Sequence, residues 1–316
     1  MTSRARISAA AVLAGTSGLA VALGGCTERR STPLPSASGS LSAAAPSASA
    51  VPPRPASSVS ILAGATPIPP AVVASVLNPT KLPVYEGPFG SVEGIVRYAG
   101  PPPETVDEKW PRACGALPPG FDKAFRVTSD GRLGDAIVGV TEYDGRFVPP
   151  LDEAALVRID RCLFDKRTVT LTFGQRVEVL NDGDVPAMPK LHGSRSPAVM
   201  VAVPHGDAVR MYPQVVGRYE LGDEMGNGYL RAEVFVFKYA THGVTDTSGH
   251  FSIGRVPVGK VRVSARHPKF PEGLASTEVE IAEGKATKIE LTIDVPATRA
   301  SASTRQKPPV DRAAPR

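Results

Sequence analysis

Short runs of alternating apolar and polar residues, separated by clusters of Gly, Pro or Asp, recur between residues 86 and 296. This spacing is typical of strands joined by tight turns, whereas helical periodicity is weak apart from the N-terminus and residues 70–77. The pattern predicts an all-β fold made of one or two antiparallel β-sandwich units. The predicted strands are 91–98, 124–128, 136–142, 168–173, 176–180, 198–203, 232–239, 260–265, 277–281 and 288–293.

The last two predicted strands, 277–281 and 288–293, alternate strictly on either side of Ala282-Glu-Gly-Lys. A short turn between two alternating runs favours an antiparallel pair. We therefore expect these strands to form a hairpin with one face in the core and one in water.

The N-terminus has the order of a secretory signal. Arg4 and Arg6 precede an apolar run that ends in Leu23-Gly24-Gly25-Cys26. A basic start, an apolar stretch and a small-residue cleavage site predict a signal peptide at 1–25, and Cys26 occupies the acylated position of a bacterial lipobox. The alternatives are an ordinary signal with an incidental Cys, or a spanning helix, which the short run and its glycines disfavour.

Acylation of Cys26 would add several acyl chains, such as palmitate, and two or more chains anchor a protein stably. We therefore expect a partner in the membrane and a location in the cell envelope. Thr27 follows the Cys where an Asp would favour inner-membrane retention, which favours the outer membrane of a Gram-negative bacterium.

Composition separates a folded range from two ends. Residues 26–85 and 297–316 are rich in Pro, Ala and Ser, and such segments bury too little apolar surface to order themselves. They are predicted to be a disordered linker and a basic disordered tail. The net charge of +5 comes from the ends and the signal, so residues 86–296 are net acidic and nucleic acid is not an expected partner. The basic ends could contact acidic envelope proteins or polysaccharide through their opposite charge.

One stretch carries a specific motif, Val244-Thr-Asp-Thr-Ser-Gly-His-Phe-Ser-Ile-Gly-Arg-Val-Pro-Val-Gly-Lys-Val-Arg-Val263. It resembles the signature of carboxypeptidase regulatory-like domains, which are small transthyretin-like sandwiches, and the resemblance covers 232–296. It implies a tight turn at Asp246 and Gly249, with Phe251 and Ile253 in the core. It also implies a structural or binding module without peptidase chemistry.

A wider and weaker resemblance covers about residues 90–265 and implies a cupredoxin-like unit at 86–231. It rests on Gly90-Ser-Val-Glu-Gly-Ile-Val-Arg-Tyr-Ala-Gly-Pro101, on Cys114 and Cys162, and on a strand that ends in Asn181. These features resemble exported proteins with a cupredoxin-like (plastocyanin-like) sandwich, whose copper-binding members place His, Cys, His and Met after that Asn. No Cys follows Cys162 here, and a blue-copper centre needs a thiolate. We therefore expect no cofactor and no metal.

A copper-binding alternative uses soft ligands instead. Met188, His192 and Met225 could supply thioether and imidazole donors for Cu(I). Pro186 and Pro189 interrupt the first part of this segment, so we expect Met188 and His192 to lie in a loop that no strand holds.

Export would place Cys114 and Cys162 in an oxidising space, where free thiols seldom persist. We predict one disulfide between them, and the alternative is two separately buried thiols.

Three further groups are interpreted as structural. A hydrolase triad could be drawn from His192, Ser194, His205 and Asp207, but the sequence has no G-x-S-x-G elbow to present a nucleophilic serine. His242, His250 and His267 fall at strand and turn positions, and Asn181-Asp-Gly-Asp184 is interpreted as a polar turn. The sequence therefore predicts a binding or structural envelope protein without catalytic activity, with a copper-binding protein as the alternative and an enzyme third.

Overall fold

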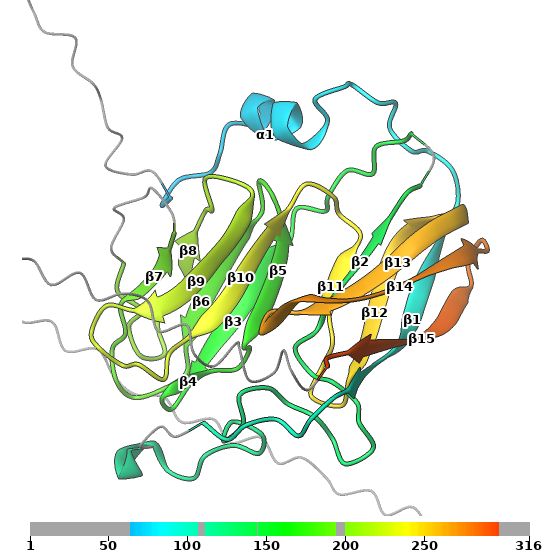
Figure 1. The fold of residues 1–316 in the computed structure, drawn as a ribbon. Coiled ribbons are helices and arrows are strands. Elements are labelled where there is room, and N and C mark those ends of the chain that lie inside the picture. The colour runs from blue at the N-terminus through cyan, green and yellow to red at the C-terminus, as the bar shows by residue number, and fades with distance from the viewer. Residues whose placement is uncertain (1–63, 107–110, 144, 194–199, 297–316) are drawn as a thin grey trace, which may run out of the picture. The chain divides into compact units, whose positions relative to one another are not determined.

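The computed structural model describes residues 64–106, 111–143, 145–193 and 200–296 (Figure 1). These residues belong to one compact unit of the chain. The predicted signal peptide, most of the linker and the tail lie outside the described residues. Within the described ranges, no helix is long and apolar enough to cross a membrane.

The all-β prediction is confirmed, and the one α-helix of the described part, α1, spans the predicted residues 70–77. The elements are α1 (Pro70–Leu77), β1 (Phe89–Ala99), the 3-10 turn η1 (Arg112–Cys114), β2 (Ile137–Thr141), β3 (Ala154–Asp160), β4 (Leu163–Phe164), β5 (Thr168–Thr172), β6 (Arg176–Asn181), β7 (Pro189–His192), β8 (Val209–Met211), β9 (Gly217–Asp223), β10 (Ala232–Phe237), β11 (His242–Val244), β12 (His250–Pro257), β13 (Gly259–His267), β14 (Phe270–Ile281) and β15 (Ala286–Asp294).

These strands form two sandwiches, one inserted into the other (Figure 1). The inserted sandwich consists of the sheets β5-β10-β9-β7 and β4-β3-β6-β8. The outer sandwich consists of β12-β1-β15 and β11-β2-β13-β14. In chain order, β1 and β2 of the outer sandwich come first, the whole inserted sandwich (β3–β10) follows, and β11–β15 complete the outer sandwich. The boundary expected at residue 232 does not follow this division, because β1 and β2 belong with β11–β15.

Strand β1 holds the outer sandwich together across this insertion. It pairs antiparallel with β12 on one side and parallel with β15 on the other. Val92 and Val96 point into the core and are fully buried, as alternation along a strand requires. The sheet therefore forms only when residues far apart in the sequence meet.

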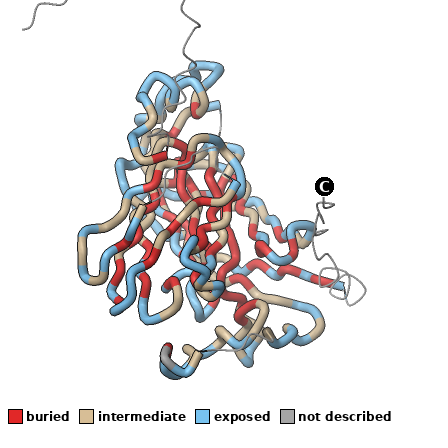
Figure 2. Tube along the Cα trace, turned by 90° about the vertical axis from the view of Figure 1, so that its left-hand side faces the viewer, coloured by how far each residue is buried: buried red, intermediate tan, exposed pale blue. Residues whose placement is uncertain are grey.

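Each sandwich has its own core, and Figure 2 shows buried and exposed positions alternating along the strands. Helix α1 adds Leu77 to the inserted core. Val138, Val140 and Val263 lie at the centre of the outer core and are fully buried. Two apolar clusters within one compact unit explain why the sequence pattern allowed either one or two sandwiches.

The predicted hairpin of the last two strands is wrong. Strand β14 pairs with β13 in one sheet, whereas β15 pairs with β1 in the other. The connection between them crosses from one sheet of the outer sandwich to the other. Residues 124–128 were also expected to form a strand, but they contribute only an isolated bridge, Val127 to Leu133.

The turn implied by the motif at 244–263 is present. The N–H of Gly249 donates to the carbonyl of Asp246 over 3.0 Å, and Gly249 has a φ of +76°. A Cβ atom at this position would lie 2.7 Å from the Cβ of Arg132, so glycine is required for both space and conformation. Phe251 and Ile253 then point into the outer core.

We predict that the free energy of unfolding decreases as the pH is lowered, because two histidines are buried without charge. Burial lowers the pKa of His242 and of His267 to about 4, from the usual 6.5 of a histidine in water. Each therefore takes up a proton more readily in the unfolded chain, and stability is lost as the pH falls from 6.5 towards 4, by about 3 kcal/mol per histidine at pH 4.

Urea unfolding at a series of pH values checks this expectation. Carboxylates titrate at the lower end, so the window between pH 6.5 and 5 is the informative one. His267→Phe should flatten the pH dependence there, since Phe125 and Phe270 already surround the ring. An unchanged slope in this variant would show that His267 is not buried in its neutral form.

Candidate functional site

Cys114 and Cys162 lie at disulfide distance, with their Cα atoms 5.6 Å apart, as the sequence predicted. Cys114 ends η1 in the β1–β2 connection, and Cys162 lies in the turn between β3 and β4. The guanidinium of Arg161 also donates to the carbonyl of Ala116 over 3.2 Å. The pair therefore ties a segment of the outer sandwich's chain to the inserted sandwich. Cys26 lies outside the described residues.

Met188 and His192, two of the candidate copper ligands, each contact Glu224, the residue before Met225. The N–H of Glu224 donates to the carbonyl of Met188 over 3.0 Å, and Met225 is the next residue after Glu224. His192 is the last residue of β7, so the expectation that no strand holds it is wrong. Pro189 is tolerated because β7 is an edge strand.

The imidazole of His192 has a carboxylate partner. Its Nε2 lies 3.4 Å from Oε1 of Glu224, whose other oxygen lies 3.3 Å from Nζ of Lys190. In the described ranges, no group of three or more His, Cys, Asp or Glu residues is arranged to hold a metal ion.

Among the described residues, the two histidines of the hydrolase group considered from the sequence have different carboxylate partners. His205 contacts Asp184 over 3.7 Å, whereas His192 contacts Glu224, and Ser194 lies outside the described residues. The polar turn after β6 is present, because Oδ1 of Asn181 accepts from the N–H of Gly183 over 3.0 Å.

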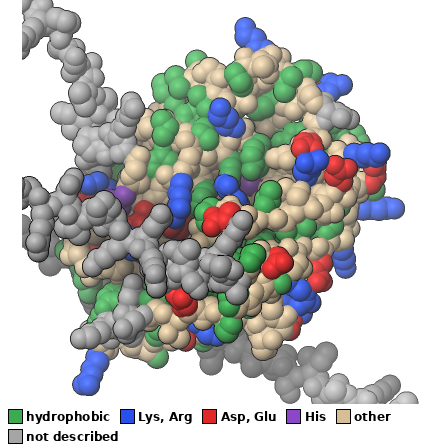
Figure 3. Space-filling model, in the orientation of Figure 1, with side chains coloured by type: hydrophobic (Ala, Val, Ile, Leu, Met, Phe, Trp, Pro, Cys, Tyr) green, Lys and Arg blue, Asp and Glu red, His purple; other side chains and the backbone are tan. Residues whose placement is uncertain are grey.

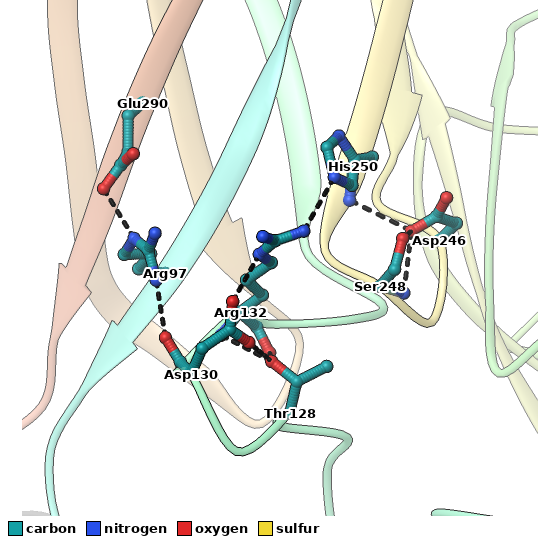
Figure 4. Close-up of polar contacts among 8 residues, drawn as sticks. All are labelled: Arg97, Thr128, Asp130, Arg132, Asp246, Ser248, His250 and Glu290. Atoms are coloured by element: carbon teal, nitrogen blue, oxygen red, sulfur yellow. Dashed lines mark hydrogen bonds and ion pairs between the residues drawn. The ribbon is translucent and has the colours of Figure 1, made fainter.

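His250 belongs to a polar network at one end of the outer sandwich (Figure 4). Arg132 donates to Nε2 of His250 over 3.0 Å. A guanidinium can only donate, so Nε2 accepts and the proton of the neutral ring is on Nδ1. Hydrogen bonds from Ser248 and from the backbone of His250 outweigh the effect of desolvation on Asp246 and lower its pKa.

The same network continues to β1 and β15. Arg97 bridges the carboxylate of Glu290 and the carbonyl of Asp130, each over 2.5 Å, while Arg132 pairs with the carboxylate of Asp130 over 2.7 Å. Every charged group drawn in Figure 4 thus has a protein partner, and we interpret the network as a structural tie between strands and loop.

A cleft of about 330 Å³ lies where the two sandwiches meet, and we call it the junction cleft. Residues 148–155 and strand β5 line it from the inserted side, and residues 240–242 with β12 line it from the outer side. Its lining combines apolar, neutral polar and charged groups: Val148, Pro149, Pro150, Leu151, Ala154, Ala155, Ala240, Ile253 and Gly254; Thr170, Thr172, Gln175, Thr241, His242 and Ser252; Glu153 and Arg255.

Hydrogen bonds settle the tautomer of His242. Oγ1 of Thr172 lies 3.2 Å from the carbonyl of Tyr239 and 3.1 Å from Nε2 of His242. Because the carbonyl can only accept, the hydroxyl donates to it, and Nε2–H donates to the hydroxyl oxygen. Nδ1 is then a buried acceptor with no partner among the described residues. Such a group is costly to leave unsatisfied.

Arg255 lies at a β-bulge in β12. Val92 pairs with Ile253 but Gly90 pairs with Val256, so one residue of β1 opposes both Gly254 and Arg255. Arg255 adopts a φ of +54°, which is uncommon for a residue with a side chain. Its guanidinium lies over the ring of Phe89, 5.3 Å from the centroid. Within the described ranges, neither Arg255 nor Glu153 forms an ion pair.

Sequence reasoning missed this cleft, although one signal was available. The inward positions of β12 run Phe251, Ile253 and then Val256, so the alternation shifts by one residue. Such a shift is the sequence sign of a bulge, and bulges redirect side chains next to functional sites. On the face shown in Figure 3, acidic and basic side chains lie beside one another over the outer sandwich.

No family model and no curated protein matches the sequence. Among solved structures, part of the chain is weakly similar to the cupredoxin amicyanin. A reduced tryptophan-to-tyrosine mutant of amicyanin is 18% identical over 28% of this chain and 85% of its own, with a TM-score of 0.24. Amicyanin from Paracoccus versutus is 16% identical over 31% of this chain and 98% of its own, also with a TM-score of 0.24. This likeness concerns the fold of a part of the chain alone.

We predict that the cysteine pair stabilises the protein substantially. A bridge that closes a loop of 48 residues stabilises by about 4 kcal/mol on the chain-entropy estimate. A double variant, Cys114→Ala with Cys162→Ala, should lower the free energy of unfolding by roughly that amount in urea titrations. If both thiols react with an alkylating agent before any reductant is added, the bridge is absent.

Proposed function

We propose that this chain is a lipid-anchored protein of the bacterial cell envelope that binds a small ligand without catalysing a reaction. The junction cleft carries the proposal. It is concave, it combines an apolar wall with a few polar groups, and it lies between two sandwiches, which are features typical of ligand sites. An arginine and a glutamate that have no ion pair within the described residues supply charge for recognition.

Anchoring is supported by the sequence around Cys26 and by the cysteine pair. The small residues before Cys26 fit lipoprotein processing. A pair at disulfide distance fits an oxidising compartment outside the cytoplasm. The motif at 244–263 supports assigning the outer sandwich to the transthyretin-like class, whose members are binding or structural modules.

The lack of catalysis is supported by the groups around His242. The hydroxyl of Thr172 donates to the carbonyl of Tyr239, so His242 does not activate it as a nucleophile. A histidine with a pKa of about 4 is also poorly suited to take up a proton near neutral pH.

We expect the membrane association to depend on one thiol. Cys26→Ser removes the acylated atom and should move the protein from the membrane fraction to the soluble fraction, while its circular dichroism stays unchanged. Metabolic labelling with palmitate should mark the wild-type protein and not the variant. Wild-type protein that is soluble with an unmodified Cys26 would contradict the anchoring.

We expect ligand binding to depend on the space in the junction cleft. A Cβ atom at Gly254 meets no other atom within 4 Å, so Gly254→Phe should fill the cleft without disturbing the fold. The same is true of Gly228, which does not line the cleft, so Gly228→Phe is a matched control.

Thermal unfolding in the presence of amino acids, dipeptides, N-acetylglucosamine and simple disaccharides provides the measurement. A ligand at about ten times its Kd stabilises by about 1.4 kcal/mol. Gly254→Phe should abolish such a shift, and Gly228→Phe should retain it. If no compound shifts the transition, or if a shift persists in Gly254→Phe, the junction cleft is not the binding site.

The alternative function is copper binding by Met188, His192 and Met225. It is favoured by the backbone bond that brings Met188 next to Glu224, beside Met225. Tight, stoichiometric Cu(I) binding that is lost in Met188→Ala and in His192→Ala would favour this alternative over the junction cleft.

A further inference from the structure

We propose that the junction cleft binds the free carboxylate of an amino acid or short peptide through Arg255. This inference rests on the proposed binding function and names its ligand class. It starts from a cation that lines the cleft and has no acidic partner in the described part of the chain.

The backbone conformation of Arg255 is tied to its place at the cleft. Two residues of β12, Gly254 and Arg255, occupy the length of one on β1, and the extra residue is accommodated at φ +54°. A left-handed conformation is unfavourable for a residue with a side chain, and it persists only where the surroundings enforce it. At this position the guanidinium lies over the ring of Phe89, and no carboxylate of the described residues pairs with it.

A stacked guanidinium is well prepared for a carboxylate. Stacking on an aromatic ring uses the face of the guanidinium and leaves the N–H groups at its edge free to donate. Their fork matches the two oxygens of a carboxylate, and such bidentate pairs are stronger than hydrogen bonds between neutral groups.

Charge limits the ligand further. Glu153 lines the same cleft and also forms no ion pair within the described residues. Its negative charge disfavours a dianion such as a phosphate monoester, and it suits a ligand that carries an ammonium group as well. One arginine and one glutamate therefore complement a zwitterion, which is the ionic form of an amino acid or short peptide.

The remaining walls suit the rest of such a ligand. Pro149, Pro150 and Leu151 offer apolar surface for an aliphatic side chain, while Thr170 and Ser252 offer hydroxyl groups for amide atoms. A cleft of about 330 Å³ is at the small end of ligand sites, which favours one or two amino-acid residues over a longer chain.

Titration calorimetry of the full chain in detergent tests this inference with two probes, L-alanyl-L-alanine and its C-terminal amide. The free acid should bind roughly tenfold to a hundredfold more tightly than the amide, as expected for the loss of a charge-assisted hydrogen bond. Arg255→Gln should weaken the acid by a similar factor. Arg210→Gln removes the same charge from an exposed position on β8 and should leave the affinity unchanged.

Three outcomes would overturn the inference: equal binding of acid and amide, unchanged affinity in Arg255→Gln, or no binding of either dipeptide. The comparison of the two probes uses the wild-type chain and does not depend on how the variants fold. A saccharide that stabilises the wild-type protein but not Gly254→Phe would preserve the binding function while excluding the carboxylate ligand. If neither a dipeptide nor a saccharide binds, the junction cleft is not a binding site for either class of ligand.

Discussion

The contact between the two sandwiches is the constraint on which the rest of the structure depends. Strand β10 has one face in the inserted core, through Val234 and Val236. It presents Phe235 and Phe237 on the other face, and Tyr239 continues this aromatic row just after the strand. Phe235 is nevertheless buried, with the guanidinium of Arg266 from β13 lying 5.9 Å from its ring centroid. The aromatic row of β10 is therefore covered in part by the outer sandwich.

Small residues and directed hydrogen bonds fit the two sandwiches together. A Cβ atom at Gly139 would lie 2.9 Å from the hydroxyl of Tyr239, so the glycine in β2 makes room for the aromatic row. The hydroxyl of Thr241 donates to the carbonyl of Val140 over 2.7 Å, which fixes the chain where it returns to the outer sandwich. The junction cleft lies beside this contact, so its two walls are positioned by the packing that joins the sandwiches.

Local features were predictable from the sequence. Strands β1, β2, β5, β6 and β13 and helix α1 follow apolar patterns that are visible in a short window, and the turn at Gly249 follows from its motif. The pairing of Cys114 with Cys162 followed from compartment chemistry and the number of available thiols. These features depend on neighbouring residues or on composition, which a single sequence contains.

The features that were not predicted depend on distant partners. Strand β9 carries charged side chains that pair across the sheet, as Glu220 does with Arg231 over 2.8 Å, and this obscures its apolar alternation. The partner of β15 is β1, almost two hundred residues earlier, and no local pattern specifies that pairing over a hairpin with β14. The junction cleft was missed for the same reason, because its walls come from four separate segments.

Backbone amide chemical shifts, recorded by NMR while L-alanyl-L-alanine is added to the full chain, test the central claim most directly. The account predicts shifts concentrated at residues 148–155, 170–175, 240–242 and 252–255, which line the junction cleft from both sandwiches. Shifts confined to β7 and the residues around Met225, or an unchanged spectrum, would contradict it.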